Sequence, residues 1–462
     1  MSRLHLPVDP AVTDPGGPLL VTPVGGFAVA TDGMLAAADR LRALEARLHD
    51  DERRAAAADA IHPGVPVPEL RAALDRVRGR CADLREAIAR AAAEYGETER
   101  VVSAVQHELG ARLATLLGPI LHSAVILAPG PLLALALAGR WYLSDDERAA
   151  AIERFVVEHP ELVSSPEFVR NVSILATSVD DLQPSILGVP IGPRGGAEAS
   201  ALALLGTAGL VGLMREGHVR TDRVGTIAGG SAPVGVRERF DRIPEGDQVR
   251  IERYDAPGMP PRFTVYIGPT ETFSPHADRE PWDLTSNVAG VAGLSPGSLR
   301  AVEQAMADAG VAPGHEVQVI GYSQGGLIAT LVAASGDWNV VGVETHGAPT
   351  GGIRLPDGLS GMAIRNTDDF IPALGGPQLD DHLLQVEREA FAGDAALPEQ
   401  LVPAHQRVAY ERTADAVDAA ASSVVREQVR ALDTFGADYL ERGGTLTVTT
   451  YHSERVDGFT KS

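Results

Sequence analysis

Residues 317–330, VQVIGYSQGGLIAT, constrain the fold of this chain more than any other stretch. The segment opens with an apolar β-type run, continues into the pentapeptide GYSQG and ends in an apolar helical pattern. This order predicts a strand, a sharp turn and a helix, with Ser323 at the apex of the turn. Gly321 and Gly325 make such a turn feasible, because side chains there would collide with the adjoining strand and helix.

The predicted turn gives Ser323 the setting of a nucleophile. A serine at a helix N-terminus lies close to unpaired N–H groups, which favour developing negative charge. We therefore interpret Ser323 as a catalytic nucleophile. The alternative is a serine of no special role in a Gly-rich loop between a strand and a helix.

A nucleophilic serine needs an imidazole to remove its proton and a carboxylate to orient that imidazole. In enzymes with this kind of turn, the acid and then the histidine follow the serine along the chain. A short predicted strand, residues 361–366, leads to Asp368 and Asp369. Neighbouring side chains point in different directions, and Asp369 stands directly before an apolar Phe-Ile-Pro run. We therefore predict Asp369 as the acid, against the alternative of a turn or helix-cap aspartate.

His405 is the predicted base. It follows a loop that contains a proline and opens a helical pattern, so it can reach the serine from a loop. Three other histidines are not assigned as the base. His346 follows the strand next after the nucleophile, a place that usually forms the wall of the pocket. His382 precedes a predicted strand and is interpreted as structural, and His452 lies too late in the chain, inside the regular terminal strand.

Acyl transfer also needs two N–H groups that bind the developing oxyanion. Gln324, directly after the nucleophile, supplies the first. Residues 248–254 and 262–267 alternate as a β-hairpin and lead to Gly-Pro-Thr at 268–270. Because proline has no N–H, we predict Thr270 as the second donor, against the alternative of an ordinary Gly-Pro turn. Trp282, in the loop that follows, either lines an acyl pocket or packs in the core.

Several of these motifs, in this order, resemble the class 3 lipases of the α/β-hydrolase superfamily. In that pattern a β-hairpin, a Gly-Thr oxyanion loop and a GxSxG turn come before Gly-x-Pro, Asn-x-x-Asp-x-Val-Pro and a late His-x-x-Tyr. Here GAP stands at 347–349 and NTDDFIP at 366–372, while Gly-Pro-Thr and the longer spacing from His405 to Tyr410 depart from the pattern. The pentapeptide GYSQG is similar to the turn of cutinases, whose disulfides a single Cys81 excludes.

The resemblance covers about residues 245–415 and implies both a fold and an activity. The fold class is α/β, with a mostly parallel sheet of the α/β-hydrolase type and flanking helices over residues 230–462. The activity is cleavage of a carboxylic ester, with a lipid-like acyl group, through an acyl-enzyme intermediate on Ser323. No metal and no cofactor are implied, and the expected partner is a small-molecule or lipid ester.

Residues 1–109 are predicted to be helical. Leucines at helical spacing in 32–60, and again from about residue 68 to beyond 105, predict two amphipathic helices joined by a Pro/Gly turn. Such a hairpin resembles the substrates of type VII secretion, whose Tyr-x-x-x-Asp/Glu signal is matched by Tyr95 and Glu99. The resemblance implies contact with a secretion machinery. The alternative is a plain interaction hairpin.

Residues 110–229 are predicted to hold apolar helices and a connector. Residues 113–139 lack Asp, Glu, Lys and Arg, but internal Gly-Pro breaks leave no uninterrupted apolar helix of membrane-spanning length. We interpret this stretch as buried short helices or a hydrophobic hairpin, with contact to a membrane surface as the alternative. The Gly-rich stretch 225–235 is interpreted as a linker to the catalytic domain.

The composition excludes some partners and leaves localisation open. A formal net charge of −22 argues against nucleic acid as a partner. No ordinary signal peptide is recognisable at the N-terminus, so the protein is expected to leave the cell by a type VII-like route or to stay in the cytoplasm. The alternative function is that of a secreted interaction or effector protein whose hydrolase domain is secondary or inactive.

Overall fold

A computed structural model describes most of the second half of the chain and short stretches of the first half. The continuous ranges are 214–273, 277–376, 382–393 and 395–456, and the shorter ones are 14, 16–22, 42, 44–49, 53–54, 72–82, 85, 157, 160, 164–165, 169, 172 and 201. The chain divides into two compact units. Residues 1–22 with 113–462 form one, called here the α/β unit, and residues 23–112 form the other, called the N-terminal unit.

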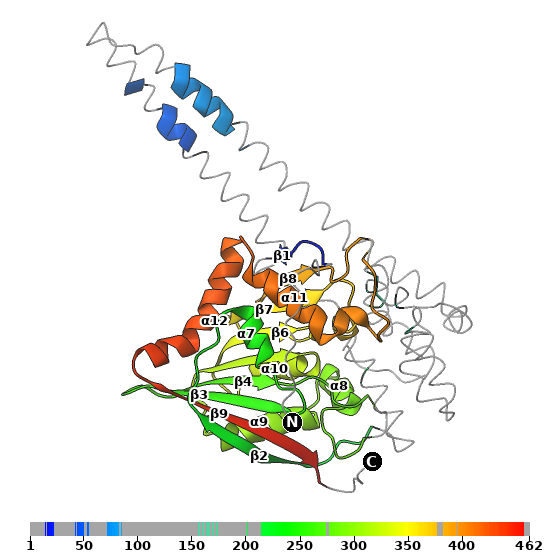
Figure 1. Cartoon of the computed structure of the whole chain (residues 1–462). Helices are drawn as coiled ribbons and strands as arrows, with labels where there is room; N and C mark the ends of the chain where they lie inside the picture. The colour runs from blue at the N-terminus through cyan, green and yellow to red at the C-terminus, as the bar shows by residue number, and fades with distance from the viewer. Residues whose placement is uncertain are drawn as a thin grey trace, which may run out of the picture. The chain divides into compact units, whose positions relative to one another are not determined.

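The α/β unit is built on a nine-stranded mixed sheet in the order β1-β8-β7-β6-β5-β4-β3-β9-β2. The five strands from β4 to β8 are parallel, and antiparallel strands extend the sheet on both sides. Figure 1 shows the C-terminal strand β9, in red, between the green strands β3 and β2. The strands are β1 (Leu20–Thr22), β2 (Val219–Ala228), β3 (Val249–Asp255), β4 (Arg262–Ile267), β5 (Val317–Tyr322), β6 (Val340–His346), β7 (Ser360–Asn366), β8 (Leu384–Arg388) and β9 (Thr445–Arg455).

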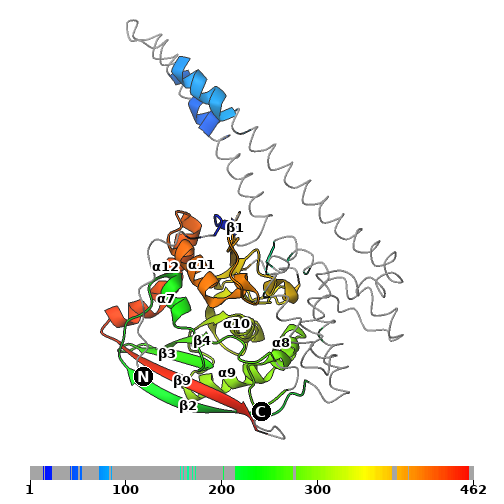
Figure 2. The ribbon, with the colours of Figure 1, turned by 45° about the vertical axis from the view of Figure 1, so that its right-hand side comes forward.

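Helices cover both faces of this sheet (Figures 1 and 2). The α-helices are α7 (Gly235–Asp241), α8 (Leu284–Val291), α9 (Gly297–Asp308), α10 (Gln324–Ser335), α11 (Arg407–Asp418) and α12 (Ser423–Glu441), and the short 3₁₀ helices are η2 (Pro372–Gly375) and η3 (Pro403–His405). Successive strand residues point to opposite faces. Val319 accordingly packs in a core with α9 and α10, and Ile320 packs in a core with α7, α11 and α12. The fold class is therefore α/β, as predicted.

The strands predicted around the serine are confirmed. The hairpin β3–β4 pairs Val249 with Ile267 and Tyr254 with Arg262, and β5 follows β4 in parallel through α9. The turn after β5 leads into α10. Long buried runs and strict alternation thus located these elements correctly.

The interpretation of residues 225–235 as a linker is wrong. Residues up to Ala228 belong to β2, which pairs with β9 over its whole length, and a bulge lies between Arg223 and Gly225. The sheet therefore starts before residue 230, and β1 adds a further strand from residues 20–22. An edge strand that is mostly exposed has no buried face, so its sequence lacks the alternation by which the other strands were recognised.

The described residues of the N-terminal unit include helical segments at 44–49 and 72–82. The Arg85 guanidinium pairs with Glu45 at 2.9 Å, and Arg78 lies 3.5 Å from His49. Going from Arg78 to Arg85 along the second segment, the partner moves back from His49 to Glu45 along the first. The two segments therefore run antiparallel. Cys81 is buried in this unit.

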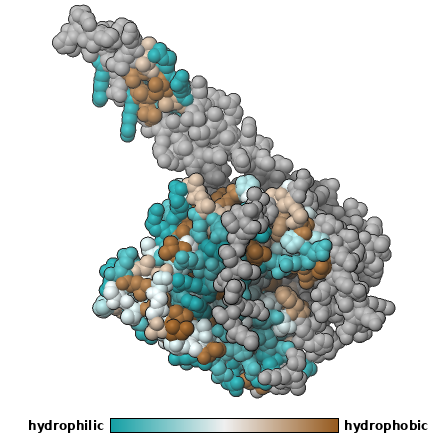
Figure 3. Space-filling model, in the orientation of Figure 1, coloured by the Kyte–Doolittle hydropathy of each residue, from teal (hydrophilic) through white to brown (hydrophobic). Residues whose placement is uncertain are grey.

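Two sequence predictions lie outside the described residues. These are the export signal at Tyr95 and Glu99 and the apolar stretch 113–139. Over the part of the chain that the structure does describe, no helix has both the length and the apolarity needed to cross a membrane. Figure 3 shows one face of the molecule, where hydrophilic residues of the described part predominate and hydrophobic ones are scattered among them.

A buried ion pair joins the layer of α7 to the centre of the sheet. Arg239 of α7 and Glu344 of β6 are both fully buried, and their side chains lie 2.8 Å apart. Arg239 also contacts Asp433 of α12. Loss of the arginine leaves the Glu344 carboxylate in the core, where among the described residues its remaining hydrogen-bond partner is His346.

We expect Arg239→Met to lower the free energy of unfolding by about 3–5 kcal/mol, because a buried charge loses its main partner. The control is Arg253→Met, whose ion pair with Asp255 is 40% exposed on both sides. That change should cost about 1 kcal/mol or less. Urea unfolding measures both, and equal losses in the two variants would contradict the expectation.

Candidate active site

The turn between β5 and α10 holds Ser323 in a conformation that few non-glycine residues adopt. Its φ is 55° and its ψ is −121°. A Cβ atom at Gly321 would lie 2.2 Å from the carbonyl of Gly325, and one at Gly325 would lie 2.1 Å from the Ile267 carbonyl oxygen. Backbone atoms cannot yield to such contacts, so both positions require glycine. The strained turn predicted from the sequence is present.

Ser323, His405 and Asp369 form a continuous chain of hydrogen bonds. The Oγ atom of Ser323 lies 2.9 Å from His405 Nε2, and His405 Nδ1 lies 2.6 Å from Asp369 Oδ2. When Nδ1 donates its proton to the carboxylate, Nε2 is left as the acceptor for the serine hydroxyl. The structure thus brings together the three residues that the sequence predicted, although they are 46 and 36 positions apart in the chain.

The three groups differ in burial. Asp369 is fully buried, Ser323 is 5% exposed and the His405 side chain is 13% exposed. The backbone N–H of Ser323 donates to the carbonyl of His346 at the end of β6. The serine is therefore tied to two parallel strands, while the histidine is the member most accessible to solvent.

The two neighbouring aspartates have different partners. The Oδ1 atom of Asp369 accepts from the Ile371 N–H at 3.0 Å, while its Oδ2 faces the imidazole. Asp368 instead accepts from the N–H groups of Ala390 and Phe391, at 2.8 and 3.1 Å. Burial raises the pKa of Asp368 to about 6. The choice of Asp369 over Asp368 agrees with this geometry, and Asp368 anchors the segment that follows β8.

Tyr410 is the second hydrogen-bond donor to the carboxylate oxygen that faces His405. Its hydroxyl donates to Asp369 Oδ2 at 2.8 Å and accepts from the Asn366 N–H at 3.2 Å. Burial raises the pKa of Tyr410 far above its usual value, so the hydroxyl keeps its proton. The ring occupies space that a side chain at Gly347 would need, since a Cβ there would lie 2.8 Å from the tyrosine. Gly347 also has a φ of 60°, which favours glycine.

Tyr322 contacts both the histidine and the ring of Tyr410. Its hydroxyl donates to the His405 carbonyl, and the two rings stack with centroids 5.4 Å apart. No role was predicted for Tyr322 from the sequence, because the residue before the serine has no fixed identity in the motif. Its position at the end of β5 brings it under the loop that carries His405.

The other histidines occupy separate places. His346 is fully buried, and its Nε2 lies 3.1 Å from Glu344. His382 lies 3.4 Å from Asp357, and His452 sits on β9 opposite Asp222. These partners do not include Ser323 or Asp369, which agrees with the choice of His405 over the other three, and a pocket wall at His346 stays a prediction.

Thr270 and Gln324 lie on the opposite side of the serine from the acid. The carbonyl of Gly268, two residues before Thr270, would lie 2.6 Å from a Cβ at Gly325, so the loop after β4 borders the turn. Gln324 is the first residue of α10, where N–H groups have no partner within the helix. The Asn287 side-chain amide donates to Thr270 Oγ1 at 2.9 Å. Because that amide nitrogen only donates, the hydrogen of the Thr270 hydroxyl is left for another acceptor.

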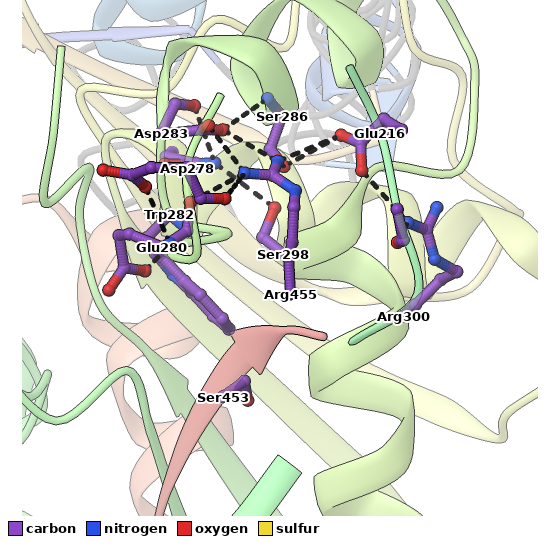
Figure 4. A network of polar contacts seen from close by, with 12 residues as sticks. Glu216, Asp278, Glu280, Trp282, Asp283, Ser286, Ser298, Arg300, Ser453 and Arg455 are labelled. Atoms are coloured by element: carbon purple, nitrogen blue, oxygen red, sulfur yellow. Dashed lines mark hydrogen bonds and ion pairs between the residues drawn. The ribbon is translucent and has the colours of Figure 1, made fainter. Parts of the chain in front are cut away.

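Trp282 packs in the core rather than lining a pocket. It is fully buried, and its indole N–H donates to the Gly268 carbonyl at 3.1 Å. Figure 4 shows the polar network around it, which includes Asp283, Glu280 and Arg455. Neither Asp283 nor Arg455 was predicted from the sequence to have a role. Asp283 had a recognisable signal as a helix N-cap, Asp-x-x-Ser, whereas nothing local marks Arg455.

No group of histidine, cysteine, aspartate and glutamate side chains within the described ranges could hold a metal ion. Compared with known proteins, the chain matches no family model, no curated protein and no solved structure at a significant level.

Glu280 in this network has a pKa raised to about 7, mainly because burial penalises its charged form, with Glu271 and Asp283 adding to the shift. One carboxylate oxygen, Oε1, accepts both from Gln248 at 2.7 Å and from the Trp282 N–H at 2.8 Å. Between about pH 5 and pH 7 the folded protein therefore holds a proton that the unfolded chain releases. Stability attributable to this group falls as the pH rises through that interval.

We expect Glu280→Gln to remove this loss, because glutamine keeps the accepting oxygen and carries no charge. The quantity to compare is the melting temperature of the variant minus that of the unsubstituted protein. This difference should be more positive at pH 8 than at pH 5. Thermal unfolding at both pH values measures the difference. Glu399→Gln, at an exposed position, is the control, and a Glu280→Gln effect that is equal at both pH values would contradict the assignment.

Proposed function

We propose that this protein is a serine hydrolase that cleaves carboxylic esters. The observation that carries the proposal is the hydrogen-bonded chain from Ser323 through His405 to Asp369. The strained serine turn at a helix N-terminus supports it, because such strain is commonly found where a nucleophile must be exposed. The fold supports it as well, since the serine, the acid and the base all follow parallel strands of an α/β sheet. An α/β-hydrolase identity is part of the same proposal.

The proposed reaction has two stages. Ser323 Oγ attacks the ester carbonyl while His405 Nε2 takes the hydroxyl proton, and the imidazolium then gives that proton to the departing alcohol. A water molecule, deprotonated by the same nitrogen, attacks the acyl carbonyl. The bond between the acyl carbon and Ser323 Oγ then breaks, His405 Nε2 returns the proton to Oγ, and the carboxylic acid leaves. Asp369 holds the imidazole in the required tautomer, and Thr270 and Gln324 stabilise the oxyanion of both tetrahedral intermediates.

The substrate class rests on the resemblance of the motifs to those of lipases, which favours an ester with a lipid-like acyl group. The net charge of −22 disfavours a polyanionic substrate such as a nucleic acid, and an uncharged ester is compatible with it. Export through Tyr95 and Glu99 stays a separate prediction, as does an interaction or effector role for the N-terminal unit.

We expect Ser323→Ala to abolish hydrolysis of p-nitrophenyl butyrate and labelling by a fluorophosphonate probe, because both need the serine oxygen as nucleophile. The fall in kcat should be about 10⁴-fold or more. Ser335→Ala, at the end of the same helix, is the control and should retain both activities. Undiminished labelling of Ser323→Ala, at another serine, would refute the assignment.

Tyr410→Phe should move the acidic limb of the pH profile of kcat/KM to higher pH. Without the tyrosine hydroxyl, the Asp369 carboxylate is less neutralised by donors and stabilises the protonated form of His405 more strongly. A hydrogen bond to a charged group is worth about 1.5–3 kcal/mol, so its loss is large enough to be seen in the profile.

The control for this prediction is Tyr439→Phe, whose hydroxyl donates to the Pro260 carbonyl. Initial rates from pH 5 to pH 9 give both profiles. A loss of kcat/KM that is uniform across this range, with an unmoved acidic limb, would show that Tyr410 acts through packing alone.

A further inference from the structure

Arg455, at the end of the C-terminal strand β9, is a fully buried guanidinium with several acceptors (Figure 4). It pairs with the Asp283 carboxylate through two nitrogens, at 2.7 and 3.0 Å. It also donates to the carbonyl of Glu280 at 2.8 Å and to Ser286 Oγ at 3.1 Å, and Glu216 lies 3.4 Å away. One side chain from the last strand thus fastens the loop before α8 and the first turn of α8.

Asp283 connects this ion pair to the loop after β4. Its carboxylate caps α8 by accepting from the Ser286 N–H at 2.9 Å. The adjacent Trp282 carbonyl accepts from the N–H groups of Glu271 and Thr272, at 2.8 and 3.2 Å. With the indole bond to Gly268, these contacts hold the loop on both sides of Thr270.

The same region reaches the residue that follows the nucleophile. The Gln324 side-chain amide is buried and donates to Ser298 Oγ at 3.2 Å and toward the Asp283 carbonyl at 3.4 Å. The Asn287 side chain, from the helix that Asp283 caps, holds Thr270 Oγ1. Both oxyanion donors therefore have contacts that lead to Asp283 within one or two hydrogen bonds.

We propose that Arg455 and Asp283 are positioning residues for the oxyanion hole: their buried ion pair holds the loop of Thr270 and the side chain of Gln324 in place. This inference rests on the proposed ester hydrolysis. Neither residue touches the reacting atoms. Their effect is to keep two N–H donors aimed at a small volume beside Ser323, where a displacement of about 1 Å is costly.

Two variants loosen the pair in different ways. Arg455→Lys keeps a positive charge in the core but loses the two-pronged contact and the bonds to the loop carbonyls. Asp283→Asn keeps the shape and one oxygen for the Ser286 N–H, so it is the milder change. Arg300→Lys is the matched control, because Arg300 pairs with the same Glu216 at 3.0 Å yet is 31% exposed and contacts neither the loop nor α8.

The decisive measurement compares p-nitrophenyl butyrate with its thiono analogue, in which sulfur replaces the carbonyl oxygen. Sulfur is a poor hydrogen-bond acceptor, so an aligned oxyanion hole favours the oxygen ester strongly and a displaced one favours it less. We expect Arg455→Lys and Asp283→Asn to lower kcat for the oxygen ester by about tenfold to a hundredfold, with KM changed little. The rate with the thiono ester should fall far less, and Arg300→Lys should change neither rate.

Equal losses with both substrates, in proportion to the folded fraction measured by circular dichroism, would overturn the positioning role and leave the proposed function intact. If Arg455→Lys does not fold, Asp283→Asn alone tests the positioning role. In that variant, an unchanged ratio of the rates with the oxygen ester and the thiono ester would also overturn the role. Absence of ester hydrolysis in the unsubstituted protein would instead refute the proposed function.

Discussion

The close approach of backbone to backbone at the serine turn is the constraint on which the site depends. Side chains at Gly321 and Gly325 would overlap main-chain atoms of the turn and of the β4 end. This packing places the loop after β4 directly beside the first turn of α10. It also lets Ser323 bond to the end of β6 while its hydroxyl faces the opposite loop. The positions of the nucleophile and of its N–H neighbours therefore follow from one steric condition.

The two sides of the site are held by different physical means. On the side of Asp369, a neutral side chain makes the link: Asn366 at the end of β7 donates to the Ala404 carbonyl at 2.7 Å and accepts from the Thr413 hydroxyl at 2.8 Å. That side chain joins the strand before Asp369 to the loop that carries His405. On the side of Thr270, a buried ion pair makes the link, and it reaches the loop from the last strand of the sheet. Removing one partner of a buried ion pair leaves an uncompensated charge in the core. This side of the site is therefore less tolerant of substitution.

Sequence patterns predicted the central elements well and the edges poorly. Buried parallel strands such as β5 are continuous apolar runs, and the hairpin β3–β4 alternates clearly, so both were located from the sequence. The edge strands β1 and β2 were missed, because one has three residues and the other is almost wholly exposed. Exposed strands show no alternation of hydrophobic and polar residues, so the sequence of such a strand does not indicate which strand it pairs with. The same limit applies to Arg455, whose partners lie about 170 positions earlier in the chain.

The sequence by itself determined the strand, turn and helix around Ser323, the choice of Asp369 and His405 as its partners, and the α/β class. Local rules suffice for these features, since glycine requirements, hydrophobic period and chain order are all written in short segments. Only the tertiary structure decided that Asp368 binds the backbone after β8, that Tyr322 and Tyr410 contact the histidine and the carboxylate, and that Arg455 contacts the loop before α8. These are contacts between side chains distant in the chain, and the packing of the layers, not any local pattern, sets which of them meet.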